Sequence, residues 1–114
     1  MEKQIEQYVD TIRKDYADWM MRGISKRDGD PVVAMNMIQR FHNGVTVKPG
    51  RKYIKVCNGS SVHSFIVATD NDKKFRKGDI LKAAGYNAPA RNAARGNILD
   101  DNYSVNWTGA EYLR

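Results

Sequence analysis

Hydrophobic residues recur at helical spacing through the first 44 residues of this 114-residue chain. Between residues 2 and 22 they return every three or four positions, which predicts a helix with one apolar face. That face comprises Ile5, Tyr8, Val9, Ile12, Tyr16, Trp19 and Met20. Gly23 is placed to end this helix, and the polar segment 25–30 predicts a loop.

A second helix is expected from Pro31 to the Asn43-Gly44 pair. Asp30 stands at the N-cap position and Pro31 at the first helical position, two residue types that favour a helix start. The predicted buried stripe of this helix is Ala34, Met37, Ile38 and Phe41. Residues 1–44 are therefore expected to form a helical hairpin.

From Val45 onward the apolar period changes from 3.6 to 2, which predicts strands. The strands are expected at 45–48, 51–57, 61–68 and 79–83, with a final one at 102–107. Asn58-Gly59 favours a tight hairpin turn, and a helix over 75–84 is the alternative to the 79–83 strand. The pattern predicts one α+β domain over residues 1–114, with a helical hairpin (1–44) and a basic β-rich module (45–114). Its two helices would pack on a small, mostly antiparallel sheet of three or four strands.

The segment from Lys82 to Asp101 is polar and irregular, with one proline, two glycines and three asparagines. One helical turn is expected at 90–95, with Arg91 and Arg95 on one side of it because they are four residues apart. The asparagines are expected to hold the loop through local hydrogen bonds. Two interpretations compete for this segment: a binding loop, or a connection whose arginines are structural.

Basic charge is concentrated in the strand-rich part of the chain. The formal net charge is +6, yet residues 1–30 carry six Lys or Arg against seven Asp or Glu. Between Lys48 and Arg95, eleven basic residues stand against three acidic ones. Such an asymmetry favours an anionic partner, nucleic acid above all.

Strict alternation places Tyr53 and Lys55 on one face of the predicted hairpin, and His63 and Phe65 are expected on the same face. Aromatic rings stack on bases while lysines contact phosphates. The alternative is that Tyr53 and Phe65 lie beneath another element. The candidate nucleic-acid-binding residues are Lys52, Tyr53, Lys55, His63, Phe65, Lys73, Lys74, Arg76, Lys77, Lys82, Arg91 and Arg95.

Residues that carry catalytic chemistry are sparse. One cysteine, Cys57, and two histidines give no zinc-ligand spacing, and no phosphate-binding glycine pattern occurs. A nucleophile–base pair of Cys57 and His63 is the weaker interpretation, because a lone cysteine in a strand is usually a buried core residue. We expect no catalytic residue, no metal and no cofactor. Apolar runs of at most four residues predict no membrane span, and the lone cysteine is typical of a reducing cytoplasm.

Three stretches carry a resemblance to a known family: GRKYIKVCNGSSVHSFIV, KKFRKGDILKAAGYNAPARNAARGNIL and VNWTG. With them the chain resembles a family of small tailed-bacteriophage proteins without an assigned activity. The resemblance spans roughly Val45 to Gly109, which leaves the helical part as a variable extension. It implies a phage product in the cytoplasm of an infected bacterium, and it carries over no catalytic residue. Binding and inhibition of a host protein is the alternative function, and a minor component of the phage particle is a third.

Overall fold

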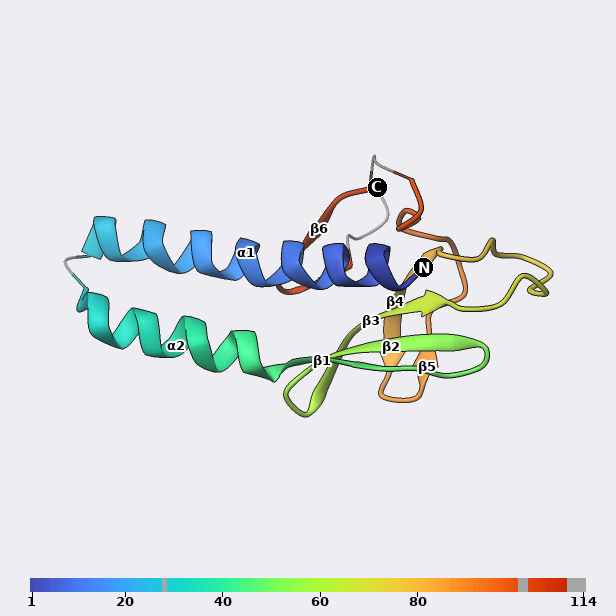
Figure 1. The fold of residues 1–114 in the computed structure, drawn as a ribbon, viewed down its shortest axis with the longest axis horizontal. Helices are drawn as coiled ribbons and strands as arrows, with labels where there is room; N and C mark the ends of the chain where they lie inside the picture. The colour runs from blue at the N-terminus through green and yellow to red at the C-terminus, as the bar shows by residue number, and fades with distance from the viewer. Residues whose placement is uncertain (28, 101–102, 111–114) are drawn as a thin grey trace.

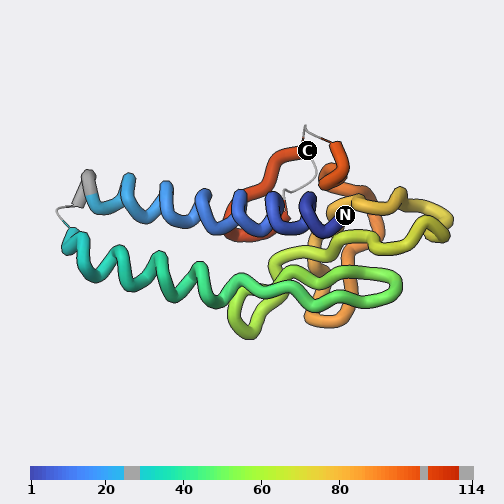
Figure 2. The backbone as a smooth tube through the Cα atoms, in the orientation of Figure 1, coloured from blue at the N-terminus to red at the C-terminus, as the bar shows by residue number. Residues whose placement is uncertain are grey.

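Two antiparallel helices form a hairpin that extends from one end of a strand-rich body (Figures 1 and 2). Helix α1 spans Glu2–Arg27 and helix α2 spans Pro31–Gly44. The computed structural model describes residues 1–27, 29–100 and 103–110. The molecule measures 51 × 27 × 26 Å, and the tip of the helical hairpin lies at one end of the long axis. None of the helices described is long and apolar enough to cross a bilayer.

The predicted start and end of α2 are confirmed. The Asp30 carboxylate accepts a hydrogen bond from the Val32 N–H at 2.9 Å, and Pro31 occupies the first turn. The predicted end of α1 at Gly23 is wrong, since the helix continues to Arg27. A single glycine costs a helix only about 1 kcal/mol, which good helix formers on either side can offset.

An aromatic cluster joins the two helices where they meet the body. The rings of Tyr16 on α1 and Phe41 on α2 stack with centroids 4.0 Å apart. Trp107 packs edge-on against both, and its backbone N–H donates to the Asp15 carboxylate at 2.9 Å. Phe41 is buried as predicted, whereas the predicted burial of Met37 is wrong, since this side chain is 43% exposed.

Five strands form one antiparallel sheet whose order follows the chain, β1-β2-β3-β4-β5. Their bounds are β1 Val45–Lys48, β2 Tyr53–Asn58, β3 Ser61–Val67, β4 Ile80–Gly85 and β5 Ala88–Pro89. A separate two-stranded sheet pairs β6 (Val105–Asn106) with β7 (Gly109–Ala110). The α+β class is confirmed, but the main sheet exceeds the predicted three or four strands. The final strand expected at 102–107 is confined to β6, and residues 101 and 102 lie outside the described part.

The alternative helix over 75–84 and the helical turn expected at 90–95 do not form. The backbone of the 90–95 segment instead pairs with β4: the Ala90 N–H donates to the Lys82 carbonyl at 2.7 Å, and the Arg95 N–H donates to the Ile80 carbonyl at 2.8 Å. Hydrogen bonds to a neighbouring strand replace the local bonds that a helical turn would need.

The sheet is covered on both faces. On the inner face, α1 packs Ile5, Tyr8, Val9 and Ile12 against core residues that include Val56, Ile66 and Ile80. On the outer face, the β3–β4 loop and the 90–95 segment cover a second apolar cluster formed by Phe65, Val67, Phe75 and Leu81. We call the β3–β4 loop and the 90–95 segment the outer cover. A partner could reach this face of the sheet only at the margins of the outer cover.

Candidate functional site

An open basic pocket of about 470 Å³ lies where the β1–β2 turn meets the β3–β4 loop. These two segments lie at the opposite end of the molecule from the tip of the helical hairpin (Figure 1). The lining residues, which we call the basic pocket, are Arg51, Lys52, Thr69, Asn71, Asp72, Lys73 and Arg91. Four cationic side chains there accompany one carboxylate, so the pocket favours an anion.

The β1–β2 turn positions two of these cations. Pro49 and Gly50 break the strand pattern after β1. A Cβ added at Gly50 would lie 2.5 Å from the carbonyl oxygen of Tyr53, so only glycine fits this tight turn. Arg51 and Lys52 follow, and both are exposed. The turn thus presents two adjacent cations at the edge of the pocket.

Arg91 holds the outer cover together. Its guanidinium forms two hydrogen bonds of 2.9 Å with the Asp72 carboxylate and a third with the Tyr53 hydroxyl. It also lies 4.9 Å from the centre of the Phe75 ring. The Asp72 side chain is only 1% exposed. These contacts join the loop before β4 to the segment after β5, so Arg91 has the structural role that was the alternative interpretation of this segment.

The Asp72 carboxylate is stabilised in its charged form. The hydrogen bonds from Arg91 are the main cause that holds the pKa of Asp72 well below its ordinary value, and the backbone N–H groups of Lys74 and Phe75 add to the effect. The same pairing raises the pKa of Arg91. The Asp72–Arg91 pair therefore stays ionised over the whole physiological pH range, and Asp72 does not cancel the charge of the other three cations.

The expected open aromatic face is wrong for Phe65. This ring is 2% exposed and lies beneath Phe75 and Tyr53, with the Tyr53 ring edge-on at 5.9 Å. A base cannot stack on it. The alternative interpretation, in which another element covers these rings, describes the structure, because the β3–β4 loop folds back over this face.

His63 also lies away from the expected face. A β-bulge between Val56 and Cys57 shifts the pairing of β2 with β3, and His63 packs edge-on against the Tyr8 ring of α1 with centroids 6.1 Å apart. Its Nδ1 lies 2.8 Å from the Ser64 hydroxyl and its Nε2 lies 2.8 Å from the Asn106 carbonyl. His63 therefore belongs to the core, and burial is the main cause that lowers its pKa.

The position of His63 also argues against Cys57 and His63 as a nucleophile–base pair. Both side chains are buried, and both ring nitrogens of His63 have partners other than the cysteine. In the part of the chain that the structure describes, no group of three or more His, Cys, Asp or Glu side chains is placed to hold a metal ion.

A second exposed feature, the Tyr86 cluster, comprises Lys48, Lys55, Tyr86 and Asn87. The Lys55 Nζ lies 4.0 Å from the centre of the Tyr86 ring and donates to the Asn87 side chain at 3.0 Å. The Lys48 Nζ donates to the Tyr86 hydroxyl at 3.1 Å, and this bond is the main cause that raises the pKa of Lys48. Tyr86 is 49% exposed. Sequence reasoning did not include Tyr86 among the nucleic-acid-binding residues, because the turn between β4 and β5 in which it lies was not predicted.

Of the four basic candidates between residues 73 and 77, only one lies in the basic pocket. Lys73 is exposed in the basic pocket, while Lys74 donates to the Arg91 carbonyl at 2.6 Å. Arg76 forms an ion pair of 2.9 Å with Asp100. Lys77 lies nearby, partly buried, and its carbonyl accepts a hydrogen bond from Asn97.

Two candidates lie apart from the basic pocket. Lys82 pairs in register with Ser64, whose side chain contacts α1, so Lys82 stands on the inner side of the sheet. The Arg95 guanidinium donates to the Ala93 carbonyl and the Asn92 side chain. Arg91 and Arg95 therefore do not form the predicted pair on a helical turn. The expected local bonds of Asn92 and Asn97 are confirmed.

Comparison with known proteins identifies a family whose function is unknown. Residues 1–113 match a family model described as a family of unknown function, DUF7717, and the chain belongs to that family. The match includes the helical hairpin, so the expectation that the helices lie outside the family's common part is wrong. The chain matches no curated protein and no solved structure.

Proposed function

We propose that this member of a family of unknown function is a non-enzymatic protein that binds single-stranded nucleic acid. The main observation in support of this proposal is the basic pocket. Within the part of the chain that the structure describes, Arg51, Lys52 and Lys73 form no ion pair with a carboxylate. Cations that are not neutralised within their own protein are available to phosphate groups.

The Tyr86 cluster supports the choice of a single strand. Its exposed ring carries a lysine at one side and has about half of its surface open. Stacking of an unpaired base on an aromatic ring is worth about 1–3 kcal/mol. Tyr86 thus takes over the stacking role that the sequence suggested for Phe65. Lys52, whose Nζ lies 5.5 Å from the centre of the Tyr53 ring, and Lys55 further along β2 connect the pocket to this cluster.

The test is a salt titration of binding to a labelled single strand of about 15 nucleotides, of DNA and of RNA, followed by fluorescence anisotropy. Each phosphate contact contributes about 0.7 to the slope of log affinity against log salt concentration. Replacing Arg51, Lys52 and Lys73 together by alanine is expected to reduce the magnitude of that slope by about 2. Tyr86→Leu is expected to weaken binding by about tenfold without changing the slope.

A matched control removes the same three charges from the helices, with Lys3, Lys14 and Arg40 replaced by alanine. All three side chains are exposed, and this variant should retain most of the slope. The proposal is wrong if the native protein binds neither strand at low salt. It is also wrong if the two triple variants lose binding equally, since net charge alone would then explain the affinity.

A second candidate function is binding to a host protein during phage infection, which the resemblance to phage proteins suggests. The exposed apolar residues of the helical hairpin favour it. Tyr86 is exposed as this function would require, whereas Trp107 packs into the aromatic cluster and Tyr112 lies outside the described residues. Capture from bacterial lysate with and without nuclease separates the two. A protein partner that survives nuclease treatment favours this second function.

A further inference from the structure

Exposed apolar side chains gather on the helical hairpin. Among the described residues, six of the eight large hydrophobic side chains with high exposure belong to its two helices: Trp19, Met21, Val32, Val33, Met35 and Met37. Helix α2 buries only Ala34 and Phe41, although Arg40 is its only formally charged side chain at neutral pH. Exposed apolar side chains that gather in this way are typical of a surface that a partner covers.

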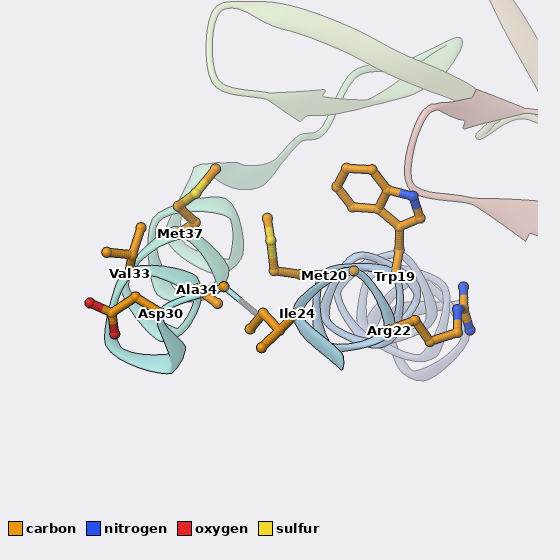
Figure 3. Close-up of a pocket in the computed structure, with 10 residues that line it drawn as sticks. Trp19, Met20, Arg22, Ile24, Asp30, Val33, Ala34 and Met37 are labelled. Carbon is orange, nitrogen blue, oxygen red and sulfur yellow. The ribbon is translucent and has the colours of Figure 1, made fainter. Parts of the chain in front are cut away.

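Part of this surface is hollowed into an apolar groove of about 410 Å³ between the ends of α1 and α2. Figure 3 shows Met20 and Met37 side by side above Ile24 and Ala34, with Trp19 on the α1 side and Val33 on the α2 side. The groove lies at the opposite end of the molecule from the basic pocket (Figure 1). Both sites are therefore accessible at the same time.

The two charged side chains that the structure describes in the groove lining have opposite signs and lie on opposite sides. Arg22 extends from α1 at one side and Asp30 stands on the α2 side (Figure 3). A two-fold axis that runs along the hairpin exchanges the two sides. It therefore places Arg22 of each copy near Asp30 of the other, while the apolar residues meet in the middle. Such self-complementarity is what a two-fold interface requires.

The same charges disfavour other occupants. A polyanion needs an excess of cations, and an anionic membrane surface needs a basic border around an apolar face. Among the side chains that the structure describes, the lining has neither, since Arg22 and Asp30 are its only charged residues. We propose that the apolar groove and the adjoining side of α2 bind the same surface of a second copy of this chain, which gives a two-fold symmetric dimer.

The small size of the surface indicates a weak dimer. Helix α2 has 14 residues, which gives a length of about 21 Å, and two helices side by side are about 20 Å wide. The face is thus about 400 Å² per copy, or about 800 Å² for the pair, below the usual size of stable interfaces. We therefore expect a weak dimer that forms in the micromolar range and above.

The test is the molar mass in solution, measured by sedimentation equilibrium from about 5 to 500 μM protein without nucleic acid. The native protein should move from monomer to dimer over this range. Met37→Glu is expected to abolish the dimer. Met35→Glu is the matched control, because it lies about 200° around the helix from position 37, away from the groove, and it should dimerise normally. Arg22→Glu should weaken the dimer about fivefold by placing like charges together.

Far-UV circular dichroism and the melting temperature of each variant show whether it is folded. A native protein that stays monomeric at 500 μM overturns the proposal. So does loss of the dimer in folded Met35→Glu with retention in Met37→Glu. If Met37→Glu does not fold, Arg22→Glu alone decides: a normal dimer in that variant overturns the proposed geometry. These outcomes are independent of nucleic-acid binding, which uses the other end of the molecule.

Discussion

His63 is expected to make the fold sensitive to mild acid. Its Nε2 lies 2.8 Å from the Asn106 carbonyl, which can only accept, so Nε2 carries the proton. In the neutral ring Nδ1 then accepts from Ser64, whose oxygen accepts from Tyr8 at 2.7 Å. Every group in this buried network has a partner. Protonation at Nδ1 adds one more donor than the network can accept, and burial already lowers the pKa of His63.

The sign of the effect follows from proton linkage. The unfolded chain takes up a proton on this residue with a pKa of about 6.5, while the folded state resists it. The unfolded state therefore binds more protons below that pH, and stability falls as the pH falls. The slope is at most about 1.4 kcal/mol per pH unit. From pH 6.5 to 5.0 the loss is at most about 2 kcal/mol, or about 8 °C in melting temperature.

Urea unfolding at several pH values between 7.5 and 5.0 measures this slope while carboxylates remain charged. The second histidine, His42, is exposed on α2 and provides the control. His42→Gln should keep the slope, and it identifies the NMR ring signal of His63, which should titrate at a lower pH than that of an ordinary histidine because burial lowers its pKa. His63→Gln should lose the slope. A native protein with constant stability over this range would refute the reasoning, as would a slope that disappears in His42→Gln.

Three further changes test the assignments of individual side chains. Phe65→Ala should destabilise by about 3–5 kcal/mol in urea unfolding, as for a buried ring; a loss of nucleic-acid binding with unchanged stability would contradict its burial. Asp30→Ala should cost about 1 kcal/mol through the lost N-cap of α2, measured by thermal unfolding. Arg91→Ala should lower the melting temperature because it leaves the Asp72 carboxylate without its cation, whereas Arg51→Ala should leave the temperature unchanged. Equal melting temperatures for these last two variants would show that Arg91 is not structural.

Local signals in the sequence predicted much of the fold. Asp30 with Pro31 determined where α2 begins, because a helix start depends on neighbouring residues only. The Asn58-Gly59 signal predicted the hairpin between β2 and β3, but the two turn residues are Gly59 and Ser60, one position later than predicted, since Asn58 pairs with Ser61. The α+β class followed from the change of period at Val45. The two-residue strand β5 was missed because Pro89 and the alanines around it give no alternation.

The candidate site was harder to predict because it depends on contacts between distant residues. The cover over the outer face depends on Asp72 meeting Arg91, 19 residues away. The place of His63 depends on a bulge between Val56 and Cys57, which alternation alone does not reveal. Exposure of Lys52, Lys73 and Tyr86 was therefore decided by the tertiary fold, although their residue types were visible in the sequence.

The bond between Trp107 and Asp15 has a consequence for folding during synthesis. The two residues are 92 positions apart, which corresponds to about 5–18 s at 5–20 residues per second on the ribosome. Helix α1 is made first, yet the sheet and the β6–β7 pair that cover its apolar side are made later. During that interval α2 is the first segment available to shield α1. We therefore expect early pairing of the two helices to protect the nascent chain from aggregation until the sheet is complete.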